Sequence, residues 1–271
     1  MKKLLTLVFL FVLTIGLVAK DNSALTLGNP SNAEQDTLSS PNNYLIEHET
    51  FSISYNRDCL IPNWVAWHLD ISDLGTGRHS GTFVVDPLLP DNWEKPKHSY
   101  YNNSGFDRGH LCPNADRNNY NLGKETFITT NIVPQTPALN RGPWKDFEDY
   151  CRKIVEEGNE LYIYAGIAEI GGESDTGKMT SYISEKHVAV PRWCWKVVLV
   201  LPVGDNDISR IDKETNVIAV CMPNLKSCKL RDLRDYVVTC RYVEEITGYN
   251  FFEQLPVSIQ DAIEVKHYQL E

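Results

Sequence analysis

The tetrapeptide DRGH at residues 107–110 is the segment of this sequence best suited to proton and phosphate chemistry. Histidine is the side chain that moves a proton most readily near neutral pH, and an arginine guanidinium can bind a phosphate through two hydrogen bonds. Residues 106–113 are expected to form a strand, along which side chains alternate between faces. Arg108, His110 and Cys112 should therefore share one face, although a single histidine is more often a hydrogen-bonded structural residue.

A second group of polar residues follows in the chain. Asn140, Trp144, Glu148 and Arg152 recur at intervals of four residues, which places them along one drifting face of a helix. An amide oxygen such as that of Asn140 suits Mg²⁺, which keeps most of its waters, and Glu148 could hold those waters. The alternative is that Glu148 and Arg152 form an ordinary surface pair across one helical turn.

Taken in order, these motifs resemble the DNA/RNA non-specific endonuclease family. The segments that carry the resemblance are SGF before DRGH, then TN at 130–131, LNRGPW at 139–144, a downstream glutamate, and the later VP, MPN and EITG followed by FF. The similarity extends from about residue 50 to residue 258. Several ordered motifs of this kind are far more specific than DRGH alone.

The resemblance implies a ββα-metal active site inside an α+β domain, with a central, mostly antiparallel sheet flanked by helices. It makes His110 the general base, Asn140 the single direct protein ligand of Mg²⁺ and Glu148 the holder of metal-bound water. Mn²⁺ is expected to substitute for Mg²⁺. Arg108 and Arg152 become phosphate or transition-state contacts.

Asn131 is assigned by the same resemblance to a supporting role near the histidine. DNA and RNA are the expected substrates, because an attack by water does not need the ribose 2′-OH. The family further implies 5′-phosphorylated products and a possible homodimer.

Two other functions are consistent with parts of the sequence. The first is a cysteine hydrolase in which Cys112 is the nucleophile and His110 its base. The second is a non-catalytic nucleic-acid-binding module on the same fold. The presence of His110, Asn140 and Glu148 together favours the nuclease over the module, since a scaffold has no need for all three.

Short β-like runs, rich in β-branched and aromatic residues, alternate with a few helical segments. Strands are expected at 51–55, 64–71, 81–86, 106–113, 126–133, 161–170, 187–191, 193–202 and 216–223. A helix over 137–157 should be kinked or split by Pro143, and residues 171–180 should form a flexible loop. A short helix should follow Thr239 and stop at Gly248, and Ser258 should cap a last helix over 259–265.

The formal net charge of −10 excludes a protein that coats nucleic acid with its whole surface. The charge is unevenly distributed, however. Residues 98–153 hold seven basic and six acidic side chains, and Lys226, Lys229, Arg231 and Arg234 face only Asp232 in a second basic stretch. We predict that these two stretches line one groove.

The N-terminus is typical of an exported protein. Two lysines precede an apolar run over residues 4–18 that is too short for an ordinary membrane span, and Ala19 offers a cleavage point. We therefore expect a signal peptide at 1–19, a flexible leader at 20–48, an endonuclease domain at 49–271 and a periplasmic or extracellular location, with no membrane association after cleavage. The alternative is that the apolar run stays uncleaved as a membrane anchor. The seven cysteines cannot all pair, and the sequence favours neither free thiols nor one or two disulfides.

Overall fold

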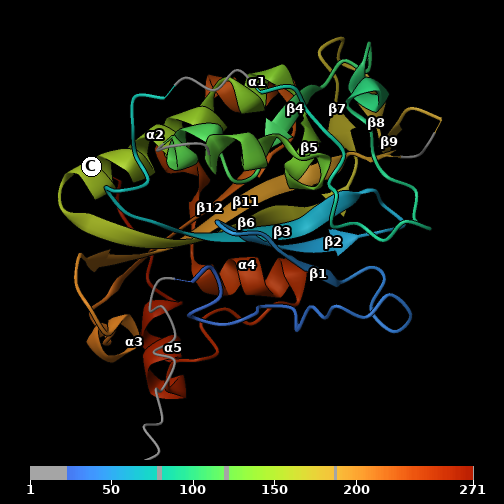
Figure 1. The fold of residues 1–271 in the computed structure, drawn as a ribbon. Helices are drawn as coiled ribbons and strands as arrows, with labels where there is room; N and C mark the ends of the chain where they lie inside the picture. The colour runs from blue at the N-terminus through green and yellow to red at the C-terminus, as the bar shows by residue number, and fades with distance from the viewer. Residues whose placement is uncertain (1–22, 78–80, 119–121, 186–187, 271) are drawn as a thin grey trace, which may run out of the picture.

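The centre of the molecule is a seven-stranded antiparallel sheet (Figure 1). The computed structural model describes residues 23–77, 81–118, 122–185 and 188–270. In spatial order the strands are β1 (Tyr44–Glu47), β2 (Ser52–Asn56), β3 (Ile61–Leu69), β6 (Asn159–Ile170), β11 (Pro191–Pro202), β12 (Asn216–Pro223) and β13 (Val237–Val238). The longest strands, β3, β6, β11 and β12, are adjacent, so the middle of the sheet is the most extensively paired.

Both faces of the sheet are covered, and each face has its own apolar core. Side chains alternate along a strand, so Trp64 of β3 joins one core while Trp67 joins the other. On β11, Trp195 and Val198 divide between the two cores in the same way. This two-sided burial explains why these strands are nearly continuous apolar runs.

Different elements cover the two faces (Figure 1). The hairpin of β4 (Asp107–His110) and β5 (Ile132–Gln135) lies over one face together with α1 (Pro137–Asn140) and α2 (Pro143–Glu156), while α4 (Cys240–Thr247) covers the other. The remaining helices are α3 (Asp207–Arg210) and α5 (Val257–Ile263), and the remaining hairpins are β7 (Gly172–Glu173) with β8 (Met179–Thr180) and β9 (Tyr182–Ile183) with β10 (Val188–Ala189). Six 3-10 helices lie among the described residues: η1 (His98–Tyr101), η2 (Asn114–Arg117), η3 (Leu122–Phe127), η4 (Thr129–Asn131), η5 (Lys226–Leu230) and η6 (Leu233–Tyr236).

The α+β class and the antiparallel sheet flanked by helices are confirmed. The helix after residue 137 is indeed divided, with α1 ending at Asn140 and Pro143 opening α2. The short helix α4 is also as predicted: the Thr239 side chain accepts a hydrogen bond from the Tyr242 N–H, and Gly248 adopts a left-handed conformation at the C-cap. None of the helices in the described ranges is long and apolar enough to cross a membrane.

Several expected elements differ in the structure. Residues 81–86 form an isolated bridge between Val84 and Ile128 rather than a strand. Residues 126–131 are 3-10 turns rather than strand, since the Thr129 and Thr130 hydroxyls bond to neighbouring segments instead of leaving the backbone in a ladder. The expected loop at 171–180 contains the β7–β8 hairpin, and α5 begins at Val257 after Pro256, so Ser258 is not its cap.

The prediction of a flexible leader at 20–48 is wrong for residues 23–48. Leu27 is fully buried, and β1 pairs with β2 in the main sheet. The asparagines that suggest flexibility instead bond to the chain: the Asn29 side chain accepts from the Ala33 N–H and donates to the Ala33 carbonyl, each at 2.9 Å. The folded domain therefore begins well before residue 49, while the predicted signal peptide at 1–19 lies outside the described residues.

Candidate active site

The β4–β5 hairpin positions the DRGH segment above the main sheet. Arg108 lies opposite Pro134 and His110 opposite Ile132. The glycine between them is required by close packing, because a Cβ at Gly109 would lie 2.2 Å from the side-chain oxygen of Gln135. The β4–β5 hairpin and the helix α2 form the ββα unit that the family resemblance implies.

The His110 imidazole is enclosed by two aromatic rings. Its imidazole lies between the rings of Phe83 and Phe127, with centroid separations of 5.4 and 5.1 Å. Its Nε2 atom is buried and has no hydrogen-bond partner among the described residues. Burial, assisted by the positive charge of Lys196, lowers the pKa of His110 to about 4. The ring is therefore in its neutral form at neutral pH.

Arg108 is fixed by contacts on two sides. Its guanidinium donates to the His98 carbonyl oxygen at 2.8 and 3.1 Å and to Asn102 Oδ1 at 2.6 Å. Its Cζ atom lies 5.7 Å from the Phe83 ring centroid and 5.8 Å from that of Tyr101. The side chain lines an open cavity of about 430 Å³, where it can meet an anionic group.

Asn140 is oriented from the other face of β4. Its Nδ2 atom donates to Asp107 Oδ2 at 2.9 Å, and Arg141 binds the same carboxylate with two hydrogen bonds of 2.7 and 2.8 Å. This contact fixes which end of the amide is the oxygen. Within the described part of the chain, no group donates to Asn140 Oδ1, so it can serve as a ligand.

Glu148 and Arg152 do not form the surface pair offered as an alternative. Glu148 Oε1 instead accepts from Lys196 Nζ at 3.2 Å, while Arg152 Nη1 donates to Asp116 Oδ1 at 2.7 Å and Nη2 donates to Asp149. Burial raises the pKa of the Glu148 carboxyl, and the Lys196 ammonium opposes that rise. The Arg152 guanidinium is thus engaged by two carboxylates, and its role as a phosphate contact stays a prediction.

Asn131 is fully buried and its side chain contacts only backbone. Its Oδ1 accepts from the Cys112 N–H, and its Nδ2 donates to the carbonyl oxygens of Cys112 and Thr126, each at 2.9 Å. Both partner residues, Cys112 and Thr126, lie in the connection between β4 and β5. Asn131 therefore positions the segment that follows His110.

Cys112 does not join His110 in a catalytic pair. Its thiol is fully buried in the apolar core, and burial raises its pKa far above the usual range. A thiolate nucleophile needs a lowered pKa and access to substrate, so the cysteine-hydrolase hypothesis is wrong. All seven cysteines are free thiols, and only Cys59 is not buried.

With this geometry established, comparisons with known proteins identify the family. The sequence profile of the DNA/RNA non-specific endonucleases matches residues 29–258. The chain belongs to this family. It is 40% identical over 243 residues to a nuclease of Nostoc sp. (strain PCC 7120), covering 89% of this chain and 85% of that protein. It is 30% identical over 244 residues to nuclease C1 of Cunninghamella echinulata var. echinulata, covering 87% and 90% respectively.

A solved structure supports the fold of this non-specific endonuclease. A chain from the crystal structure of the EndoG/EndoGI complex superposes with a TM-score of 0.71, covering 90% of this chain and 96% of that chain. The two sequences are 22% identical. The similarity confirms the α+β architecture of the central sheet and its flanking elements.

The donor set of this endonuclease fits a magnesium ion. Asn140 offers a neutral oxygen whose direction is set by Asp107, and Glu148 offers a carboxylate on the second turn of α2. Mg²⁺ binds few protein ligands and keeps several waters. One amide oxygen and one outer carboxylate are therefore sufficient for such a site.

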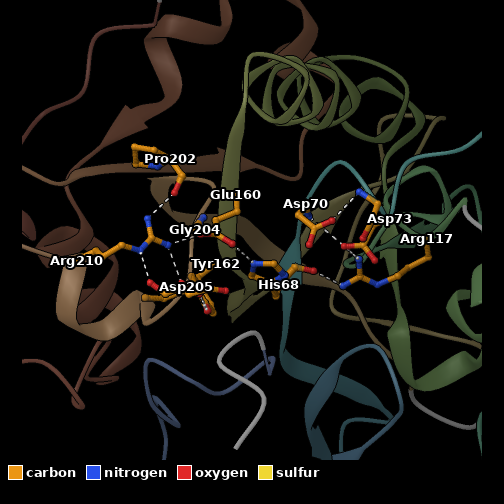
Figure 2. A network of polar contacts seen from close by, with 12 residues as sticks. His68, Asp70, Asp73, Arg117, Glu160, Tyr162, Pro202, Gly204, Asp205 and Arg210 are labelled. Carbon is orange, nitrogen blue, oxygen red and sulfur yellow. Dashed lines mark hydrogen bonds and ion pairs between the residues drawn. The ribbon is translucent and has the colours of Figure 1, made fainter. Parts of the chain in front are cut away.

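Two groups of His and acidic residues elsewhere could also be considered as metal ligands (Figure 2). His68, Asp70 and Asp73 form one, and His68, Glu160 and Asp207 form the other. An arginine contacts each group: Arg117 lies 3.2 Å from Asp73, and Arg210 lies 2.5 Å from Glu160 and 2.7 Å from Asp207. These ion pairs engage three of the four carboxylates, and His68 Nε2 lies 3.2 Å from Glu160 Oε2, so we assign the network to structure.

The two basic stretches meet in part. Arg141 lines the cavity that contains Arg108 and also a neighbouring cavity of about 380 Å³ lined by Lys226 and Lys229. The predicted groove is therefore present for these four residues. Arg231 and Arg234 line neither cavity, and the Arg234 side chain instead reaches the Leu270 carbonyl oxygen.

The sequence pointed to no role for three residues of this site. Lys196, Asp107 and Asp116 contact Glu148, Asn140 and Arg152 respectively. The available signal was a single lysine within the apolar run of β11, because a charge in a buried strand is costly unless it is paired.

Proposed function

We propose that this chain is an exported, magnesium-dependent endonuclease that hydrolyses phosphodiester bonds of DNA and RNA with little sequence specificity. The observation that carries the proposal is the partly exposed His110 imidazole, which lies two residues from Arg108 on β4 and whose Nε2 has no hydrogen-bond partner among the described residues. An imidazole kept neutral and unpaired beside Arg108 suits removal of a proton from water near a phosphate.

In the proposed reaction His110 accepts the proton of the attacking water. The Phe83 and Phe127 rings restrict its motion and limit its hydration. Arg108, already anchored to the His98 carbonyl oxygen, faces the open cavity and stabilises negative charge on the phosphate.

Asn140 would bind the metal ion directly and Glu148 would hold metal-bound water. When bound, Mg²⁺ neutralises charge on the phosphate and stabilises the leaving oxygen. The contact of Asn140 with Asp107 keeps the amide oxygen available, and Lys196 keeps Glu148 in place. Mn²⁺ has similar oxygen preferences and should replace Mg²⁺.

Digestion of plasmid DNA and RNA with the wild-type protein and with His110→Ala would test the proposed function. Wild type should cut both substrates and give 5′-phosphate ends, EDTA should abolish cleavage, and Mg²⁺ or Mn²⁺ should restore it. His267→Ala is the matched control, because His267 is exposed near the C-terminus. Cleavage by His110→Ala at the wild-type rate would refute the base assignment, and nucleic-acid binding by wild type without cleavage would support the non-catalytic module.

The cavity between Arg141 and η5 is the proposed path of the substrate backbone beyond the reacting phosphate. Lys226 and Lys229 line it, and each could neutralise one phosphate. The double variant Lys226→Gln/Lys229→Gln should raise KM and reduce the salt dependence of binding by roughly one to two units in log–log slope, with kcat little changed. Lys213→Gln on an exposed loop is the control, and an unchanged salt slope would contradict this path.

Export rests on the apolar run over residues 4–18 and the small residue Ala19. Expression of the full-length sequence should give protein in the periplasm or medium from which residues 1–19 have been removed. A variant that lacks this segment should stay inside the cell. The homodimer stays a prediction, which sedimentation velocity of the purified protein can test.

A further inference from the structure

Lys196 is a buried cation in the middle of the main sheet. Its neighbours across the ladder are Ala165 on β6 and Val220 on β12. The side chain is 1% exposed, and strand alternation directs it to the face covered by the ββα unit. A lone ammonium in such a place costs several kcal/mol unless its environment compensates it.

The environment compensates the ammonium with one acid, one carbonyl and two aromatic rings. Lys196 Nζ donates to Glu148 Oε1 and to the Leu111 carbonyl oxygen, both at 3.2 Å. The same atom lies 4.1 Å from the Trp144 ring centroid and 5.4 Å from that of Trp67. Two hydrogen-bond acceptors and two aromatic rings therefore hold the ammonium in place.

These partners connect the two halves of the proposed site. Leu111 directly follows His110, and the Trp144 indole N–H donates to the His110 carbonyl oxygen at 3.1 Å. Two consecutive carbonyls at the end of β4 are thus held, one by Lys196 and one by Trp144. Lys196 also binds Glu148 on α2, so a single side chain relates the base to the carboxylate.

We propose that Lys196 is a positioning residue of the active site, which fixes the Glu148 carboxylate and the end of the strand that carries His110. The proposal rests on the proposed function. Lys196 does not touch substrate, so it acts only through these two groups. Outer groups of this kind typically change metal affinity or activity by about 10–100-fold when they are removed.

The test is a double-mutant cycle of Lys196→Met with Glu148→Gln. Methionine keeps an unbranched apolar side chain between the two tryptophans but has no charge and no N–H donor. Lys196→Met should lower kcat by about 10–100-fold with little change in KM for DNA. The same substitution in the Glu148→Gln background should lower kcat by a clearly smaller factor, because there it removes only the contact with the Leu111 carbonyl oxygen. Lys213→Met is the matched control, with unchanged kcat.

A second measurement does not depend on activity. Mn²⁺ binding to the metal-free protein, followed by electron paramagnetic resonance, should weaken by roughly tenfold in Lys196→Met. If the methionine variant is unfolded at the assay temperature by circular dichroism, Lys196→Gln replaces it in the same cycle. Equal losses of kcat in both backgrounds together with unchanged Mn²⁺ affinity would overturn the proposal. Activity retained by His110→Ala would instead overturn the proposed function, so the two failures are distinguishable.

Discussion

Replacement of Asn131 by alanine should greatly reduce the stability of the folded protein. The substitution removes three hydrogen bonds and leaves one buried N–H and two buried carbonyl oxygens without their partner. Each such group costs about 1–3 kcal/mol, and water entering the new space can recover part of that cost. We therefore expect a loss of roughly 3–6 kcal/mol in the free energy of unfolding, which is a large share of the ~5–15 kcal/mol typical of a folded protein.

The assay combines urea unfolding and calorimetry with activity measured well below the transition. The melting temperature should fall by roughly 10–20 °C, because about 1 kcal/mol corresponds to about 2–4 °C in a domain of this size. Asn159→Ala is the matched control: its side chain donates one hydrogen bond, to the Ile154 carbonyl oxygen, so it should lose only about 1 kcal/mol. A melting temperature of Asn131→Ala within about 2 °C of wild type, together with a large loss of kcat in folded protein, would refute the positioning role and indicate a direct catalytic one.

Three further predictions concern titration and reactivity. The pKa of His110 is lowered to about 4, so its neutral form predominates above that pH. The acid limb of kcat/KM should therefore lie below pH 5, and an acid limb at pH 6.5 or above would contradict His110 as the general base. Burial and the nearby Glu244 raise the pKa of Glu264 from 4.5 to about 7, so the folded state binds more protons than the unfolded state between these values and stability falls as pH rises through them. The free energy of unfolding of Glu264→Gln relative to wild type, measured with urea, should therefore be about 1–3 kcal/mol higher at pH 8 than at pH 4. A lower relative value at pH 8 would count against this reasoning. Iodoacetamide should modify only Cys59 in the folded protein, with activity retained, and mass spectrometry that finds Cys112 alkylated alongside inactivation would oppose its burial.

Local spacing was sufficient to place much of the site. The DRGH strand, the division of the helix at Pro143 and the capped helix α4 all depend on residues within a few positions of each other. Such features follow from backbone geometry, from the missing N–H of proline and from side-chain caps. They can be predicted from the sequence because the physical cause and its effect lie in the same short segment.

The sequence-based predictions are wrong for segments whose conformation depends on distant partners. Residues 23–48 have the composition of a flexible leader, yet Leu27 and β1 pack against the domain. Residues 81–86 have the composition of a strand, yet within the described chain their one ladder contact is the isolated bridge between Val84 and Ile128. Composition reports what a segment could do, whereas the availability of a partner decides what it does.

The sequence by itself determined the family, the α+β class and the identity of the residues that could act as base, metal ligand and phosphate contact. Only the tertiary structure decided their partners. Glu148 pairs with Lys196, which is 48 residues away, rather than with Arg152 one turn further along α2. The reason is physical: within a helix the spacing of side chains is fixed by the backbone, but a buried charge takes the partner that the packing of sheet against helix brings to it.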